Sequence, residues 1–260
     1  MSERLPRWRK IVPVAAVLFL ALALRFLPLE HGFPRNYVPD THAVRAALGM
    51  AKDHDLAPRV GKYSSYPYLM PYMLLPIYGA QYALGKARGE WHGAEEFGAV
   101  VAENPERVAL PARALVALFG ALTALAVYFA ARAAGLQRGA LAAMFLAATA
   151  LLHVQMSVQE RPWAIVVFFG ALCSWACIHF AATGRARSLV LSGACAGLAF
   201  AAHQAGLFFA FLTACTWIFC GRDEADWRGS VLAKRVLLAL QAALVCIVVG
   251  VVCGHAYYLV

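Results

Sequence analysis

Residues 188–220 read SLVLSGACAGLAFAAHQAGLFFAFLTACTWIFC, and the way this run crosses a membrane decides the fold of the chain. As one helix it would be about 50 Å long, well beyond the roughly 30 Å of hydrocarbon that a span must cross. The polar residues His203 and Gln204, followed by Gly206, interrupt the run near its middle. The run is therefore either one overlong span or two short helices that go out and return.

The composition places the chain among membrane proteins. It has 260 residues, of which 62% are hydrophobic and 14% are charged. A soluble domain normally carries about 25% charged residues. The formal net charge of +9 does not indicate a nucleic-acid partner, because most basic residues stand at the ends of apolar runs, where they orient spans in a membrane. We expect an all-α integral membrane protein that binds no nucleic acid.

Five further runs are apolar and long enough to propose as spans, given that a span needs about 20 residues. They cover residues 11–29, 109–131, 139–158, 162–183 and 236–260. The first follows the basic segment MSERLPRWRK, which resembles the start of a signal peptide. No clear small-residue cleavage site follows the apolar core, so we expect an uncleaved first span.

The distribution of positive charge decides how often residues 188–220 cross. With the N-terminus in the cytoplasm, the inside loops carry these basic residues: Arg132, Arg138, Arg185, Arg187, Arg222, Arg228, Lys234 and Arg235. That pattern follows the positive-inside rule only if residues 188–220 form two short helices with a turn at 203–206 on the outer side. We therefore predict a polytopic bundle of about seven transmembrane helices in the cell (inner or plasma) membrane.

The region between the first two spans, residues 30–106, is then an extracytoplasmic loop. Within it, Val44, Ala47, Leu48 and Ala51 recur at helical spacing and form an apolar stripe, which predicts a helix lying in the membrane interface. Residues 68–85, YLMPYMLLPIYGAQYALG, are rich in tyrosine and proline and predict a second, partly embedded helix. We treat residues 1–260 as one transmembrane domain, in which 11–29 is the first span and 107–260 hold the others.

One carboxylate stands directly before the first of these loop helices. Residues 36–50 read NYVPDTHAVRAALGM, with Asp40 where a helix N-cap is expected. Thr41 is an alternative cap, which would leave the side chain of Asp40 available for chemistry. From the residues alone, Asp40 is either a capping residue or a catalytic group.

Several motifs, taken in order, resemble a known family. They are DLAP (55–58), YPYLMPYML (66–74), PARALVALFGALTALAVYFAAR (111–132), HVQMSV (153–158) and GLAFAAHQAGLFF (197–209). Their order and spacing are similar to those of GT-C glycosyltransferases, specifically the bacterial family 39 group related to protein O-mannosyltransferases and to the aminoarabinose transferase of lipid A. The resemblance implies a hexosyl or pentosyl transferase that moves a sugar, with inversion, from a polyprenyl-phosphate carrier to an acceptor hydroxyl.

The resemblance also implies roles for particular residues and partners. Asp40 matches the catalytic base of the family. The residues we expect to contact the substrate are His42, Arg45, Lys62, Glu160, Arg161 and His203. The implied partners are the lipid-linked sugar donor, a glycan, lipid or protein acceptor, and membrane lipids. We expect no cofactor, and a divalent metal near Asp40 and His42 or at residues 53–55 is the alternative.

Three positions depart from the family pattern and leave other functions open. Thr41 stands where a second acid is common, Trp163 stands where an acid often precedes the fourth span, and His203 stands where lysine is common. A non-catalytic subunit that binds a lipid-phosphate carrier is therefore the alternative function, ahead of a transporter. Family members usually carry more spans, so the chain is a shortened paralogue, a fragment truncated at its C-terminus, or half of an enzyme that a partner chain completes.

Overall fold

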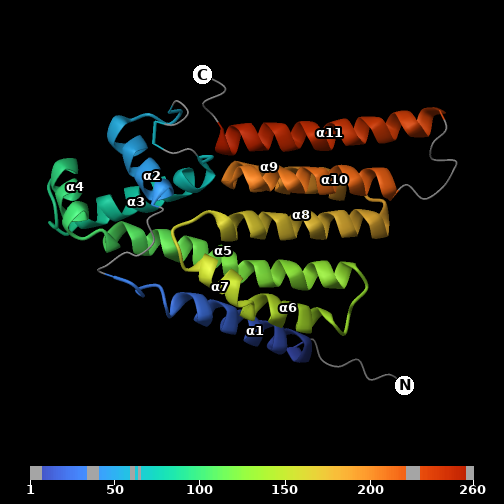
Figure 1. The fold of residues 1–260 in the computed structure, drawn as a ribbon, viewed down its shortest axis with the longest axis horizontal. Helices are drawn as coiled ribbons and strands as arrows, with labels where there is room; N and C mark the ends of the chain where they lie inside the picture. Colours follow the sequence, from blue (N-terminus) through green and yellow to red (C-terminus); the bar gives the residue numbers. More distant parts are fainter. Residues whose placement is uncertain (1–7, 34–40, 59–61, 64–65, 221–228, 256–260) are drawn as a thin grey trace.

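The computed structural model describes residues 8–33, 41–58, 62–63, 66–220 and 229–255, and every regular element in these ranges is a helix. This confirms the all-α expectation (Figure 1). The helices are α1 (Trp8–Phe26), α2 (His42–Asp53), α3 (Leu69–Ala87), α4 (Ala94–Glu103), α5 (Glu106–Ala133), α6 (Ala140–Thr149), α7 (Leu151–Ser157), α8 (Trp163–Thr183), α9 (Ala186–Ala202), the 3₁₀ turn η1 (Gln204–Gly206), α10 (Leu207–Phe219) and α11 (Gly229–Gly254).

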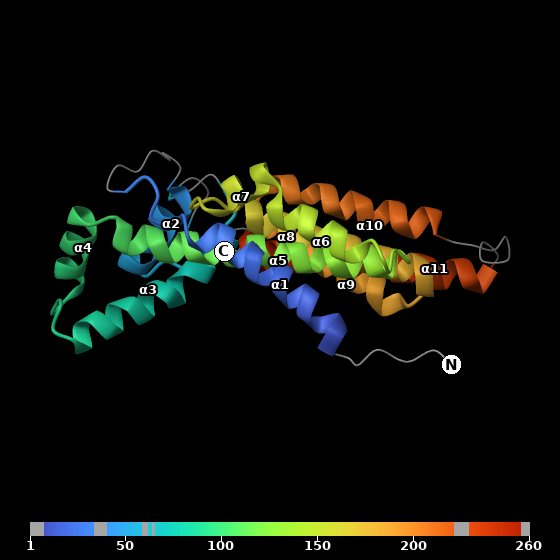
Figure 2. The ribbon, with the colours of Figure 1, turned by 90° about the horizontal axis from the view of Figure 1, so that it is seen from below.

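The long helices form a bundle whose two ends differ. In Figures 1 and 2, α5, α8, α9, α10 and α11 run along the long axis, while α2, α3 and α4 gather beyond one end of the bundle. The η1 turn and the link between α7 and α8 lie at this same end, and the turns that join α5 to α6 and α8 to α9 lie at the opposite end. The predicted loop 30–106 therefore covers one end of the bundle, as an extracytoplasmic cap would.

Three of the described helical segments are long and apolar enough to cross a membrane: Glu106–Ala133, Trp163–Thr183 and Ala233–Gly254. The pair α6 and α7 counts as a fourth span if it is one bent unit. Three shorter apolar helices, at Ile11–Phe26, Ala186–Ala202 and Gln204–Phe219, accompany them. The protein is a polytopic helical membrane protein, and the count of seven spans and their orientation stay predictions.

The run that decides the fold forms two helices, as the charge pattern predicts. The backbone of His203 is extended, with φ −160°, and it ends α9 and begins η1, after which α10 returns beside α9. Gly206 makes this turn tight, because a Cβ atom there would lie 2.1 Å from the carbonyl carbon of Ala199. His203 ends α9 by its extended backbone, and Gly206 permits the close turn that follows. Both residues could be recognised in the sequence as interruptions of the apolar run.

The contact between α9 and α11 depends on glycines that let the two backbones approach closely. A Cβ atom on Gly193 would lie 2.3 Å from the carbonyl oxygen of Ala242, and one on Gly197 would lie 2.5 Å from that of Cys246. Gly254 on α11 approaches the backbone of Ala201 in the same way. Small residues at helix interfaces are the usual route to close packing inside a membrane, where no hydrophobic effect drives the helices together.

The predicted span 139–158 is broken, which the sequence did not indicate. The segments α6 and α7 are bent by 57° at Ala150, although neither proline nor glycine lies there. The fully buried side chain of Arg25 explains the break, since its Nη1 atom donates to the carbonyl oxygen of Ala148 at 2.9 Å. The Nη2 atom of Arg25 also donates to Nδ1 of His153 at 2.9 Å. A side chain from α1 thus satisfies a carbonyl that the end of α6 leaves unpaired.

Part of the apolar stripe of α2 is covered by protein. Val44 and Ala47 are buried in one cluster with Leu69 of α3 and Val108 of α5, whereas Ala51 is exposed. The expectation of a helix is confirmed, and its place in the membrane interface stays a prediction. A single amphipathic pattern fits both environments, so the sequence alone did not separate them.

We predict that Gly197→Ala destabilises the protein by about 1–3 kcal/mol, because its methyl group would collide with the backbone of α11, which cannot swing aside. The measurement is the melting temperature of the purified protein in detergent. Gly79→Ala is the matched control, since a Cβ atom on Gly79 of α3 meets nothing within 4 Å and alanine favours a helix. Equal melting temperatures for the two variants would show that the α9–α11 contact is not close.

Candidate functional site

Four aromatic rings meet where the loop helices join the bundle. His42 of α2 contacts Tyr66 edge-on with ring centroids 5.6 Å apart, and Tyr66 lies 5.2 Å from His203. His203 in turn lies 4.2 Å from the ring of Trp163 at the start of α8. We call these four residues the ring cluster. Two of the residues predicted to contact substrate, His42 and His203, are thus brought together from positions far apart in the chain.

The predicted catalytic base lies beside this cluster in sequence but outside the described residues. Asp40 is two positions before His42, and the description resumes at Thr41. Thr41 occupies the N-cap position of α2 but makes no side-chain capping hydrogen bond. Its carbonyl oxygen accepts the first hydrogen bond of the helix, from the backbone N–H of Arg45 at 2.9 Å. The alternative that Thr41 caps α2 through its hydroxyl group is therefore not met.

Glu160 is held in a buried ion pair, which changes the interpretation of its role. Nε of Arg113 donates to Oε1 of Glu160 at 2.9 Å, and the two side chains are 4% and 0% exposed. Arg113 also donates to the carbonyl oxygens of Leu29 at 2.7 Å and His31 at 3.0 Å, and its guanidinium carbon lies 4.1 Å from the ring centre of Phe33. Glu160 is thereby tied to α5 and to the segment after α1, as a structural residue would be.

This ion pair fixes the link that leads into the ring cluster. Glu160 stands three residues before Trp163, in the short connection between α7 and α8. The second carboxylate oxygen of Glu160, Oε2, is buried and has no hydrogen-bond partner within the described residues. Removing one member of such a pair leaves an uncompensated charge in the interior, which is why buried pairs resist single substitutions. The pair therefore holds the start of α8 against α5.

Lys62, another predicted phosphate ligand, is neutralised by two neighbouring acids. Its Nζ atom lies 3.0 Å from Oδ2 of Asp55 and 3.1 Å from Oδ2 of Asp53, whose carboxylate also accepts a hydrogen bond from the hydroxyl group of Tyr63. Contacts with Tyr63, Asp55 and Asp53 raise the pKa of Lys62, and hydrogen bonds from Tyr63 and Lys62 lower the pKa of Asp53. The lysine is charged, but its charge is already balanced.

The same contacts bear on the alternative of a metal site at residues 53–55. Both carboxylates of that motif face Lys62, and His54 adopts the left-handed conformation that ends α2. Within the part of the chain that the structure describes, no three histidine, cysteine, aspartate or glutamate side chains are grouped so that they could hold a metal ion. The described residues therefore do not fit a metal at this place.

The two remaining predicted residues are arginines at the same end of the bundle. Arg45 is exposed on α2, one turn after His42, and makes no ion pair with any described residue. Arg161 is half-buried in the link between α7 and α8, between Glu160 and Trp163. Both positions suit cations that would meet an anionic group near the ring cluster.

Sequence reasoning missed three residues that organise this end of the protein: Tyr66, Trp163 and Arg113. Tyr66 stood out only as the first residue of the motif YPYLMPYML, and Trp163 only as a departure from a family pattern. Arg113 lies inside an apolar run, where an ionisable side chain is costly and therefore informative. That last signal was available and would have predicted a partner for Glu160.

Comparison with protein families shows to which family of proteins the chain belongs. Residues 100–253 match the model of the dolichyl-phosphate-mannose-protein mannosyltransferase family. The chain belongs to this family. No curated protein matches the chain. The matched segment runs from the last turn of α4 to the end of α11, so it contains Arg113, Glu160, Trp163 and His203 but not α2.

Membership of the mannosyltransferase family confirms part of the expectation drawn from the sequence motifs. It places the chain among membrane glycosyltransferases of the GT-C type. The narrower relation to the bacterial family 39 group and to aminoarabinose transferases stays a prediction, as do the donor and acceptor.

We predict that Arg113→Met and Glu160→Met each destabilise the protein by about 3–5 kcal/mol, because each leaves its former partner charged and buried. The double variant should lose less than the sum of the two, since it removes both charges. Free energies of unfolding in detergent supply the test. Arg107→Met and Glu90→Met are the matched pair, joined at 2.9 Å but about 40% exposed, and each should cost at most about 1 kcal/mol. Additive losses for Arg113 and Glu160 would contradict a coupled pair.

Proposed function

We propose that the protein transfers a sugar from a polyprenyl-phosphate carrier to an acceptor hydroxyl at the extracytoplasmic face of the cell membrane, with inversion and with Asp40 as general base. One observation carries the proposal. The family match covers the helices that supply Trp163 and His203, and the ring of His203 contacts both Trp163 and Tyr66, which in turn contacts His42 in the loop region that follows Asp40 in the sequence.

The proposed chemistry needs only an ionised and well-placed carboxylate. An aspartate of ordinary pKa, about 3.9, is ionised near neutral pH and is competent as a base once it is positioned. Asp40 accepts the proton of the acceptor hydroxyl while that oxygen forms a bond to the anomeric carbon. The bond from the anomeric carbon to the phosphate oxygen breaks, and the lipid phosphate leaves with the electron pair. Attack from the opposite face inverts the anomeric configuration.

The departing phosphate is stabilised by positive charge and by hydrogen-bond donors. Lys62 and Glu160 face oppositely charged groups of the protein. We assign this role to Arg45, Arg161 and His203, which stand on α2, in the link between α7 and α8 and at the end of α9. The Nδ1 atom of His203 accepts the backbone N–H of Ala205 at 3.1 Å, which fixes Nε2 as the N–H donor of the neutral ring. His203 therefore serves as a donor to phosphate without being protonated, in place of the lysine that the family pattern favours.

The ring cluster suits the surface of a membrane. Tyrosine, tryptophan and histidine rings favour the headgroup level, and this cluster lies where the spanning helices end. The proposed donor would present its phosphate there while its isoprenoid chain stays in the lipid. We propose no cofactor, since the chemistry uses a carboxylate base and protein donors alone, and a glycan, a lipid or a protein is the acceptor.

A second function is favoured by one specific observation. Lys62 and Glu160, two of the six residues predicted to contact substrate, are engaged in ion pairs with other protein groups. A subunit that binds a lipid phosphate without transferring a sugar would need fewer substrate-binding groups than an enzyme. We place this function second, because the family whose model matches residues 100–253 is one of transferases.

We predict that Asp40→Asn lowers transfer by about 100- to 10,000-fold, the usual contribution of a general base. The assay measures sugar transferred by the purified full chain from polyprenyl-phosphate hexose and pentose donors. Glu103→Gln is the matched control, an exposed acid on α4, and should keep full activity. Equal rates for wild type and Asp40→Asn would refute the role of Asp40 as base. Retained binding of polyprenyl phosphate with no transfer from any donor would establish the second function instead.

A further inference from the structure

A groove of about 470 Å³ runs between α5 and α8. Its walls are formed by residues within 123–134 of α5 and within 167–178 of α8, together with Leu136 after α5 and Phe209 of α10. Both walls belong to helices that are long and apolar enough to cross a membrane. Val167 and Leu136 are exposed, so the groove opens onto the lipid that surrounds these helices.

The groove suits a hydrocarbon chain rather than a polar ligand. Apart from Thr123 and Ser174, the described residues that line it are apolar. The hydroxyl group of Thr123 donates to the carbonyl oxygen of Phe119 at 2.9 Å, and the hydroxyl group of Ser174 donates to the carbonyl oxygen of Gly170 at 2.9 Å. Both hydroxyl groups are thus satisfied within their own helices, and a polar occupant would lose its hydrogen bonds to water without replacement.

The length of the groove matches one leaflet of a bilayer. The first and last lining residues of each helix stand eleven positions apart, which at about 1.5 Å per residue gives a wall of about 16 Å. One leaflet supplies about half of the roughly 30 Å of hydrocarbon in a membrane. A spanning helix of another chain would need a groove about twice as long. The acyl chain of a lipid in one leaflet is therefore the occupant that fits.

The groove leads to the end of the bundle that lies opposite the ring cluster. Both α5 and α8 run toward this end, where the turns that join α5 to α6 and α8 to α9 lie (Figure 1). Every acid that the structure describes lies instead in the loop region 30–106 or in the α7–α8 link. None of the arginines in or beside the two turns forms an ion pair with a described residue. These exposed arginines are Arg132, Arg138, Arg185 and Arg187.

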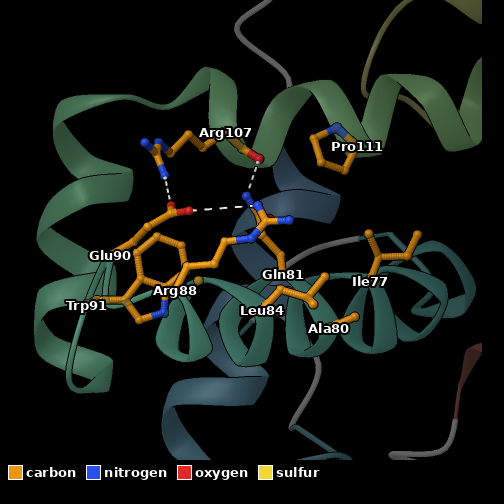
Figure 3. Close-up of a pocket in the computed structure, with 10 residues that line it drawn as sticks. Ile77, Ala80, Gln81, Leu84, Arg88, Glu90, Trp91, Arg107 and Pro111 are labelled. Carbon is orange, nitrogen blue, oxygen red and sulfur yellow. Dashed lines mark hydrogen bonds and ion pairs between the residues drawn. The ribbon is translucent and has the colours of Figure 1, made fainter.

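The charge at this end differs from that of the cavity in the loop region. There Glu90 lies beside two arginines, and its carboxylate accepts a hydrogen bond from Arg107 at 2.9 Å (Figure 3). No described acid takes that place near the groove. Basic pockets between transmembrane helices on the cytoplasmic side bind anionic lipid headgroups. The arginines at the end of the groove are therefore available to an anionic headgroup.

We propose that the groove binds one acyl chain of an anionic phospholipid, whose phosphate lies against Arg138 and Arg185. The chain lies between the small side chains of Ala130 on α5 and Ala171 on α8. The headgroup meets the two turns, because Arg138 stands two residues after Leu136 and Arg185 stands two residues after the end of α8. This lipid is distinct from the proposed sugar donor, whose phosphate is placed at the opposite end. The proposal does not depend on the transfer chemistry.

The test is a titration of the purified full chain in nonionic detergent with dipalmitoyl lipids, in which native mass spectrometry measures the fraction of protein that carries one lipid. We expect phosphatidylglycerol to bind at least about fivefold more tightly than phosphatidylethanolamine, since each arginine near an anionic lipid contributes about that factor. The double variant Arg138→Gln/Arg185→Gln should lose this preference and keep the affinity for phosphatidylethanolamine. Arg88→Gln, at an exposed arginine of the loop region, is the matched control and should keep the preference.

A second variant tests the groove itself. Ala130→Leu places a larger side chain in the groove and should weaken the binding of both lipids by about tenfold. Ala142→Leu, at an exposed position of α6 outside the groove, is the matched control and should bind as wild type does. Melting temperatures show whether each variant is folded. Should Ala130→Leu fail to fold, Ala171→Leu fills the same groove from the facing wall.

Four results would overturn the proposal. Two of them are equal affinities of the wild type for the two phospholipids and an unchanged affinity in the folded groove variant. Polyprenyl phosphate that binds more tightly than phosphatidylglycerol, and is lost in the groove variant, would assign the groove to the lipid of the proposed donor. A dimer in the native mass spectra that disappears in the groove variant would assign the groove to a second copy of the chain.

Discussion

The buried ion pair between Arg113 and Glu160 is the interaction on which the rest of the candidate site depends. Two charges removed from water are costly unless they are paired and hydrogen-bonded. Arg113 meets this condition by donating to Glu160 and to two carbonyl groups after α1. The pair therefore joins α1, α5 and the start of α8 at one point. Trp163 follows directly and presents its ring to His203.

Two other contacts hold the helices of the bundle together. Glycines let α9 and α11 pack backbone to backbone, and Arg25 satisfies the carbonyl group that the break between α6 and α7 leaves open. The loop helices then pack their apolar faces on α5 and bring His42 and Tyr66 to the ring cluster. The arrangement has the form of a helical membrane scaffold with the candidate site at one end, which agrees with membership of the mannosyltransferase family.

Much of the fold was predictable because its signals are local. The break at His203 and Gly206 follows from polar residues and a glycine within one apolar run, and the helix at residues 42–53 follows from its periodicity. The break at Ala150 was not predictable, because its cause is Arg25, more than a hundred residues earlier in the chain. In the candidate site, too, the positions of some residues follow from local signals and those of others depend on long-range contacts. His42 and His203 were predicted to contact the substrate, and the fold brings them into the same cluster. Lys62 and Glu160 were predicted as substrate ligands, but the partners that neutralise them act through contacts that spacing alone does not show.

Photocrosslinking measures whether a polyprenyl phosphate binds at the ring cluster. A polyprenyl phosphate with a photoreactive group next to its phosphate would be crosslinked to the purified full chain, and the modified peptides mapped by mass spectrometry. We expect labels on the segments that contain His42, Tyr66, Trp163 and His203, with competition by unlabelled polyprenyl phosphate. Labels confined to the exposed apolar faces of α10 and α11, or labels that unlabelled lipid does not reduce, would contradict it.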